Sequence, residues 1–130
     1  MSHPQIERLA SGKYLSLTTF KRDGSAVATP VWVARDGNEL VVITEAASGK
    51  AKRIKNNPQV EMAPCDVRGK KTGPSVTGTA QLTDSTQTEL IATQIKRKYG
   101  LAYTAIGWLE KLRRRESSGS VGIRIQVNES

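Results

Sequence analysis

The sequence is poor in the residues that build metal centres and covalent catalytic sites. It has one cysteine, Cys65, and one histidine, His3. A lone cysteine cannot form an internal disulfide, which agrees with a reducing, cytoplasmic setting. One Cys and one His cannot build a zinc site, and no Ser/His/Asp set is available. We therefore predict no metal site and no resident catalytic residue, and we interpret Cys65 as a small, partly buried packing residue.

Long apolar runs and nucleotide-binding glycine motifs are also missing. No stretch approaches the roughly 18 consecutive apolar residues of a membrane-spanning helix. The first residues lack the basic-then-apolar pattern of a signal peptide. The glycines are scattered and form neither a Walker-type loop nor a dinucleotide fingerprint. These absences predict a protein without a membrane span and without a P-loop or Rossmann site.

The chain does have a large excess of positive charge. Its 130 residues include 20 Lys and Arg against 12 Asp and Glu, a formal net charge of +8. Such an excess predicts an anionic partner: nucleic acid, a membrane surface, or a phosphorylated or polycarboxylate small molecule. Aromatic residues make up 5% of the chain and do not interleave with basic residues, so no base-stacking platform is expected. We therefore expect a small-molecule anion rather than nucleic acid.

Short alternating segments predict a β protein. Asp-Gly turns at 22–25 and 35–38 favour tight hairpins, and the length suits one domain over residues 1–130. The pattern predicts a mainly β fold with flanking helices, a small antiparallel barrel with the helices on its outside. The six predicted strands span 13–21, 26–34, 39–44, 59–65, 75–82 and 121–127. The predicted helices are 4–12, a short basic helix that stops at 56–58, 84–99 and 101–115.

Three local patterns give more detailed expectations. In the first strand, Leu15 and Leu17 alternate with polar residues, which predicts burial of one face only. Pro30 marks either a plain edge or an irregular backbone left free to face a ligand, and the residues leave both interpretations open. The helix at 84–99 is expected to open with a Thr86–Glu89 capping box and to end at Gly100. Its predicted apolar stripe is Leu90, Ile91, Ile95 and Tyr99.

The most informative stretch lies between the third and fourth predicted strands. Small residues, Ala46 to Gly49, lead into the short basic helix. Small residues at a helix start leave backbone N–H groups uncrowded, and the helix dipole adds positive potential. Lys50 and Arg53 fall on one face at i, i+3. The stretch predicts a phosphate site, although the same pattern also fits a solvated basic helix.

A predicted phosphate site thus occurs in a chain with little acid–base machinery. Chemistry of that kind is commonly carried by a bound cofactor, which the protein holds and orients. An anionic cofactor would also explain the excess of basic residues. The residues therefore favour a cofactor-dependent enzyme or a cofactor-binding protein.

Two stretches carry a family resemblance: KYLSLTTFKRDGSAVATPVWVARDG (13–37) and ITEAASGKAKRIKNNPQVEMAPCDVRGKKTGPSVTGTA (43–80). They resemble the flavin and deazaflavin oxidoreductase superfamily of pyridoxamine 5′-phosphate oxidase-like proteins, and within it the PPOX-class F420-dependent oxidoreductases. The resemblance is specific over Leu9 to Leu82 and general after Ser85. It implies an FMN-binding split β-barrel and a homodimer with two cofactor sites at the subunit interface.

The resemblance also assigns residues to the cofactor. The Ser48–Lys50 turn and Arg53 match the phosphate segment, the backbone of Thr29–Trp32 matches the segment along the ring, and Thr44 lies beside the ribityl chain. The implied cofactor-binding positions are Thr29, Pro30, Val31, Trp32, Thr44, Ser48, Gly49, Lys50, Arg53 and Cys65. Charge alone assigns further basic residues to the F420 tail, and solvated surface is the alternative for Lys52, Lys70, Lys71 and Arg113–Arg115.

The function that the resemblance implies is hydride transfer between reduced deazaflavin F420 and an unsaturated small-molecule substrate. Three alternatives stay open: an FMN-dependent oxidase or reductase of the same fold, a non-catalytic F420 or flavin binder, and a nucleic-acid-binding barrel. No motif in the sequence indicates the substrate.

Overall fold

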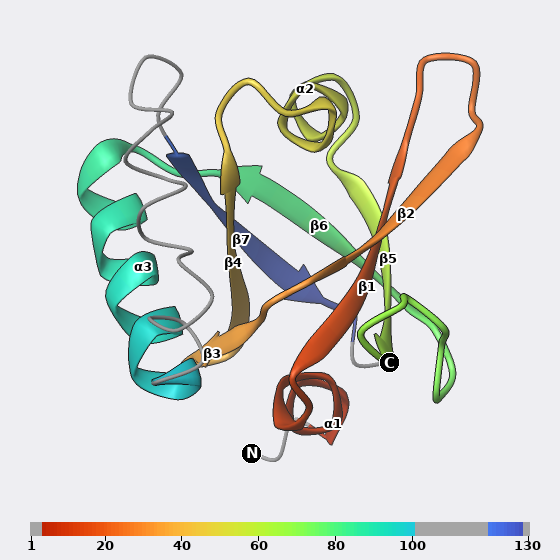
Figure 1. The fold of residues 1–130 in the computed structure, drawn as a ribbon. Helices are drawn as coiled ribbons and strands as arrows, with labels where there is room; N and C mark the ends of the chain where they lie inside the picture. Colours follow the sequence, from red (N-terminus) through yellow and green to blue (C-terminus); the bar gives the residue numbers. More distant parts are fainter. Residues whose placement is uncertain (1–3, 101–119, 129–130) are drawn as a thin grey trace.

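The strands form a single curled antiparallel sheet, shown in Figure 1. The structure, a computed structural model, describes residues 4–100 and 120–128. Within these ranges seven strands follow the order β2-β1-β5-β6-β7-β4-β3. The strands are β1 (Tyr14–Phe20), β2 (Ala26–Val31), β3 (Ala34–Asp36), β4 (Glu39–Glu45), β5 (Gln59–Cys65), β6 (Val76–Leu82) and β7 (Ser120–Val127). The helices are α1 (Pro4–Ser11), α2 (Gly49–Asn56) and α3 (Ser85–Tyr99), and the helix expected at 101–115 lies outside the described residues.

The two edge strands of the sheet are consecutive in the chain, which makes the barrel a split one. Residues 26–31 pair with β1, and residues 34–36 pair with β4. The single strand expected over 26–34 is therefore wrong, because the chain changes partner at Trp32 and Val33. The inward–outward alternation of side chains continues through the change, so the sequence pattern gave no sign of it. The expected antiparallel split β-barrel is confirmed.

Pro30 lies in β2, at one edge of this sheet. It pairs with Ser16 on the side of β1, and the other side of β2 has no strand partner among the described residues. A proline is tolerated there because its missing N–H removes no ladder hydrogen bond on the open side. The edge interpretation is confirmed, and the open edge also leaves this backbone available to a ligand.

The barrel interior is filled with apolar side chains. Helix α1 lies at one end of the barrel and α2 at the other (Figure 1). Ile6 and Leu9 of α1 and Ile54 of α2 are buried members of the barrel core. Helices α1 and α2 thus lie outside the barrel wall, as expected, and their apolar residues close the two ends of the barrel. The remaining members of this core are Leu15, Leu17, Val31, Val33, Leu40, Val42, Val60, Met62, Ala80, Ile123 and Ile125.

Strand β1 is buried on both faces, which corrects the expectation of one buried face. Ser16 is 1% exposed and Thr18 is 4% exposed, although both point away from the core of Leu15 and Leu17. Neighbouring strands flank β1 on both sides, and Ser16 lies between Pro30 and Ala63. Small side chains packed between such neighbours leave little surface, whatever their polarity.

Helix α3 covers the outer face of β4 and β7, where Ile91, Ile95 and Tyr99 are buried as expected. Leu90 is 54% exposed, so its place in the apolar stripe was wrong. The capping box was also wrong, because the side chain of Asp84 caps the helix by accepting a hydrogen bond from the Gln87 N–H (2.8 Å). The stop at Gly100 is confirmed by its φ of 53°.

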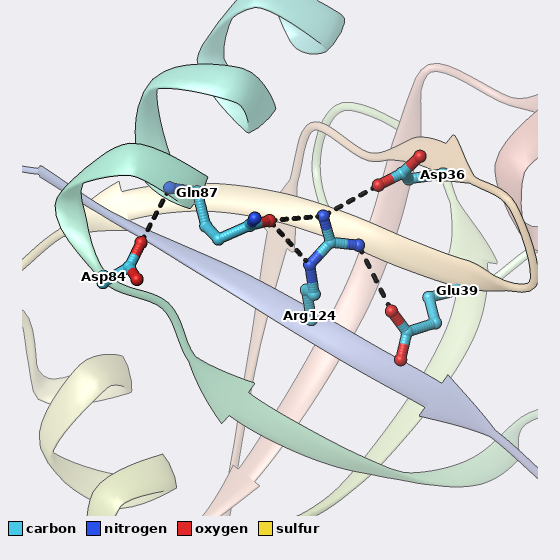
Figure 2. A network of polar contacts seen from close by, with 5 residues as sticks. All are labelled: Asp36, Glu39, Asp84, Gln87 and Arg124. Atoms are coloured by element: carbon cyan, nitrogen blue, oxygen red, sulfur yellow. Dashed lines mark hydrogen bonds and ion pairs between the residues drawn. The ribbon is translucent and has the colours of Figure 1, made fainter.

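A polar network connects α3 to the barrel at the other end of the helix from Gly100 (Figure 2). The Arg124 guanidinium of β7 forms ion pairs with Asp36 (2.8 Å) and Glu39 (3.2 Å). It also donates to Oε1 of Gln87 in the first turn of α3 (2.7 Å). The hydrogen bond and charge of Arg124 lower the pKa of Asp36. One side chain thereby joins three strands and one helix.

The last turn of α3 stabilises the segment between β2 and β3, where the chain changes strand partner. The Tyr99 hydroxyl accepts a hydrogen bond from the Val33 N–H (2.9 Å) and lies 2.6 Å from the Lys13 carbonyl. Lys98 Nζ donates to the carbonyls of Ala10 (2.6 Å), Gly12 (2.9 Å) and Val33 (2.7 Å). These bonds satisfy the backbone groups of Val33, where the chain changes strand partner, and carbonyls between the last turn of α1 and β1.

Candidate anion-binding site

Helix α2 begins in a capped turn directly after β4. The Ser48 hydroxyl accepts a hydrogen bond from the Ala51 N–H (3.1 Å), and the Ser48 N–H donates to the Glu45 carbonyl (3.0 Å). Within residues 4–100 and 120–128, the N–H groups of Gly49 and Lys50 have no acceptor. Free N–H groups at the positive end of a helix dipole suit an anion. The structure thus shows the uncrowded helix start that the small residues predicted, and the phosphate site stays a prediction.

Arg53 lies against the start of the same helix. Its Nε donates to Oγ1 of Thr19 on β1 (2.6 Å). A Cβ on Gly49 would lie 2.7 Å from Nη1 of Arg53, so the guanidinium packs on the Gly49 backbone. No carboxylate in the described part of the chain forms an ion pair with Arg53. A half-buried guanidinium bonded to a neutral hydroxyl retains its positive charge for a ligand.

Lys50 adds a second cation at this place. Burial lowers the pKa of its ammonium group, and the neighbouring charge of Arg53 lowers that pKa further, while Glu45 opposes both effects. Two cations that disfavour each other's charge make the site more favourable for an anion between them. Ser48, whose oxygen already caps the helix, has only its hydroxyl proton left to donate.

Two strand edges next to this turn are without a partner among the described residues. Strand β3 pairs with β4 only over residues 39–41, so the second half of β4 pairs with β7 alone. Thr44, at the end of that half, is 9% exposed, and its Oγ1 lies 3.5 Å from Oγ of Ser48. The long distance makes this contact a weak hydrogen bond at most. Thr44 and the Ser48 turn are therefore neighbours, as the resemblance implied.

Thr29 lies on the other open edge, β2. It faces the same side of the β1–β2 hairpin as Thr19, because Val27 pairs with Thr19 and Thr29 lies two residues further along. Its Oγ1 is buried and has no hydrogen-bond partner in the described ranges. Buried hydroxyls without a partner are rare, so Thr29 stands out among the described residues of this edge.

The side chain of Trp32 points away from this edge. It is 7% exposed and stacks on Tyr99 in the cluster under α3. Only the backbone of Trp32 is thus placed to contact a ligand at the β2 edge. Val31 is buried in the barrel core, so it too presents backbone rather than side chain.

Cys65 lies far along β5 from the helix start. It pairs with Tyr14, whereas Gln59, at the opposite end of β5, is the residue reached soon after α2. Burial raises the pKa of the Cys65 thiol, and Asp66 raises it further. Within one subunit the structure does not bring Cys65 to the α2 turn, and its assignment to the cofactor stays a prediction.

The basic residues assigned by charge are spread over the molecule. Lys70 and Lys71 are exposed in the loop after β5, and that loop approaches β2, since a Cβ on Gly69 would lie 3.5 Å from Cδ of Pro30. Lys52 is exposed on α2 beside the candidate site. The run at 113–115 lies outside the described residues.

Thr19 is the residue that sequence reasoning missed. Its position in the alternating first strand predicted packing only, and it is fully buried. The sequence signal was a hydroxyl on the face of the first strand that otherwise carries leucines, since Leu15, Leu17 and Thr19 are alternate residues. A polar group on a core face needs a partner, and that partner is Arg53.

In the described ranges, no group of three or more His, Cys, Asp or Glu side chains is arranged to hold a metal ion. No helix of 4–100 or 120–128 has the length and apolar content needed to cross a membrane.

Comparisons with known proteins give a family and a set of similar folds. The family model described as pyridoxamine 5′-phosphate oxidase matches residues 3–129. No functionally curated protein matches the chain.

Three solved structures illustrate the likeness of fold. The conserved hypothetical protein Rv2991 from Mycobacterium tuberculosis has a TM-score of 0.71 and 22% identity, over 98% of this chain and 81% of that one. The heme storage protein HutZ from Vibrio cholerae has a TM-score of 0.67 and 16% identity, over 100% and 93%. An F420 reductase has a TM-score of 0.65 and 19% identity, over 94% and 92%. At these identities the likeness concerns the fold alone.

Proposed function

The chain belongs to the pyridoxamine 5′-phosphate oxidase family, and we propose that this protein is an oxidoreductase that uses the deazaflavin F420. The observation that carries the proposal is the start of α2. Two N–H groups without an acceptor in the described ranges lie there beside Lys50 and a half-buried Arg53 that pairs with no described carboxylate. The resemblance of residues 13–37 and 43–80 to F420-dependent enzymes, and the net charge of +8, support F420 over other anions.

Each residue of the site has a binding role in this proposal. The N–H groups of Gly49 and Lys50 donate to phosphate oxygens, and Lys50 and Arg53 neutralise the phosphate charge. The hydroxyl proton of Ser48 adds one more donor. Thr44, at the end of β4, contacts the chain that joins phosphate and ring.

The open edge of β2 orients the ring. Backbone groups of Thr29, Pro30 and Val31 lie at that edge, where no strand of the described chain pairs with β2. F420 would supply two-electron hydride chemistry when bound, and the residues of this edge would hold and orient its ring. The proton that completes a reduction comes from solvent or from the substrate.

We further propose a homodimer with the cofactor sites at the interface. The outward residues of β2, namely Ala26, Ala28 and Pro30, are exposed, and β2 lies on the side of the barrel away from α3 (Figure 1). α1 and α2 pack into the barrel core, so no described helix covers these residues. The open edge of β2 borders the same surface. Light scattering of the purified protein tests this proposal, and a monomer at working concentration contradicts it.

The proposed function is tested by cofactor titration of the wild-type protein and two matched variants. Lys50→Ala should weaken F420 binding about tenfold to a hundredfold, the loss of one charge-assisted hydrogen bond. Lys55→Ala, which removes an exposed lysine near the other end of α2, is the control and should bind as the wild type does. Unchanged F420 affinity in Lys50→Ala contradicts the site.

The same preparation separates the alternatives. A yellow protein purified with stoichiometric FMN identifies the flavin-dependent alternative. F420 binding without oxidation of reduced F420 by a panel of unsaturated acceptors identifies a carrier. DNA or RNA binding that falls steeply with salt identifies a nucleic-acid-binding barrel.

A further inference from the structure

We propose that Thr19 and Gly49 are positioning residues for Arg53, and that together they aim its guanidinium at the phosphate. The inference rests on the proposed function, because it concerns the anion that the α2 turn would bind. It adds two roles. Thr19 receives no role from the sequence or from the resemblance, and Gly49 gains one beyond its own N–H.

The hydrogen bond from Arg53 to Thr19 joins two elements that are distant in the chain. Arg53 Nε lies 2.6 Å from Thr19 Oγ1, and the residues are separated by 34 positions. Thr19 is fully buried on the core face of β1, and β-branching restricts its χ1 rotamer. A rigid hydroxyl on the barrel wall therefore determines where the end of a long, flexible side chain lies.

This bond also selects which edge of the guanidinium meets a ligand. With Nε engaged by Thr19, the side edge formed by Nε and one Nη is occupied. The end edge formed by Nη1 and Nη2 remains, and its two parallel N–H donors match two oxygens of a phosphate. A lysine at position 53 would carry the charge but not the fork.

Gly49 provides the space for that arrangement. A Cβ at this position would lie 2.7 Å from Nη1, 3.5 Å from Cζ and 3.7 Å from Nη2 of Arg53. The first distance is too short for real atoms, so an alanine would displace the guanidinium rather than the helix backbone. Alanine is a better helix former than glycine. Gly49→Ala is therefore expected to keep or raise the stability of the protein while it weakens anion binding, a combination that a purely structural role does not give.

The test uses inorganic phosphate as the probe and the backbone N–H signals of position 49 and of Lys50 in NMR spectra as the readout. Wild-type protein should show saturable shifts of these signals. Thr19→Val and Gly49→Ala should each raise the apparent dissociation constant about tenfold, the effect of one lost charge-assisted bond. Thr19→Ser keeps the hydroxyl and should bind phosphate as the wild type does. Thr93→Val removes an exposed hydroxyl of α3 and is the matched control.

A second comparison connects the result to the cofactor. FMN and riboflavin differ by the phosphate, and F420 differs from its deazariboflavin fragment by the phosphate and tail. In Thr19→Val the affinity ratio of each phosphate-bearing member to its phosphate-free partner should fall about tenfold, with the phosphate-free affinity unchanged.

The outcomes distinguish the inference from the proposed function. The inference is overturned if phosphate causes no shifts in the wild type. It is also overturned if Thr19→Val and Gly49→Ala bind phosphate with the wild-type dissociation constant. Phosphate binding that depends on Thr19, in a protein that binds neither F420 nor FMN, supports the inference and contradicts the proposed function. If Thr19→Val does not fold, Gly49→Ala and Arg53→Lys decide, since both should weaken phosphate binding while the charge at position 53 is retained.

Discussion

The rings of Trp32 and Tyr99 lie face to face, with centroids 4.3 Å apart and planes 6° apart. Trp32 belongs to the segment where the chain leaves β2 for β3, and Tyr99 is the last residue of α3. The stack therefore joins the split of the barrel to the helix that covers its outer face. The backbone on one side of Trp32 is the open edge proposed to orient the ring.

The Tyr99 hydroxyl should contribute measurably to stability. Tyr99→Phe keeps the stack on Trp32 but leaves the N–H of Val33, a fully buried residue, without its acceptor. Loss of that bond should lower the free energy of unfolding by about 1–3 kcal/mol in urea denaturation. Tyr14→Phe, at a partly buried tyrosine, is the control and should change it by less. Equal effects of the two substitutions would contradict the role of the Val33 bond.

Alkaline pH should act through the same hydroxyl. Burial raises the pKa of Tyr99 to about 12 from 10.0, so the folded state favours the protonated phenol. The stabilisation is complete below pH 10 and is lost as pH rises toward 12, because the unfolded phenol releases its proton first. Two pKa units correspond to about 2–3 kcal/mol. Denaturation curves at increasing pH should show this loss in the wild type and a smaller one in Tyr99→Phe.

Sequence periodicity predicted the fold well where each strand keeps one pair of neighbours. The Asp-Gly hairpins and the stop at Gly100 both depend on local backbone preferences of glycine. The change of strand partner at Trp32–Val33 could not be predicted in this way. The alternation of apolar and polar residues shows which face of the sheet a side chain lies on, but not which strand pairs with its backbone. The sequence also did not predict that α1 and α2 cover the barrel ends, because an apolar stripe predicts burial but not the element against which the helix packs.

The candidate site was predictable only in part. The small-residue turn and the basic helix start follow from local chemistry, and the structure forms both. The contact of Arg53 with Thr19 does not follow from local chemistry, because it depends on how α2 lies across the barrel end. The position of the Trp32 side chain under α3 could not be predicted either, since its partner Tyr99 is distant in the chain.

The Arg124 network predicts a second stability effect. Arg124→Met leaves the carboxylates of Asp36 and Glu39 near each other without the cation that joins them. The free energy of unfolding should fall by about 1–2 kcal/mol, a modest value because the ion pairs are partly exposed. Arg22→Met, at an exposed hairpin position, is the control and should be nearly neutral.

Acid unfolding checks the same network independently. The hydrogen bond from Arg124 lowers the pKa of Asp36 below 3.8. Its stabilisation is present above that value and is lost as pH falls through the lowered pKa. The wild type should therefore show an acid-induced loss of stability that is smaller in Arg124→Met. Superimposable pH profiles of the two proteins below about pH 4 would rule out this contribution.

Cofactor affinity should depend on pH through Lys50. Its pKa lies below 10.5 because of burial and the Arg53 charge. An anion binds the ammonium form, so affinity is complete at neutral pH and is lost as pH rises through the lowered pKa. Lys50→Arg retains its charge over this range and should show a flatter profile. Dissociation constants of F420 between about pH 7 and about pH 10 provide the measurement, and a wild-type profile as flat as that of the arginine variant contradicts it.

The most direct test of the proposal that the start of α2 binds the F420 phosphate is a crystal structure of the protein with F420 bound. We expect phosphate oxygens at about 3 Å from the N–H groups of Gly49 and Lys50 and from the Nη atoms of Arg53, with the ring along the open edge of β2. A phosphate bound elsewhere, for example at Lys70 and Lys71, with the start of α2 in contact with protein alone, would contradict it.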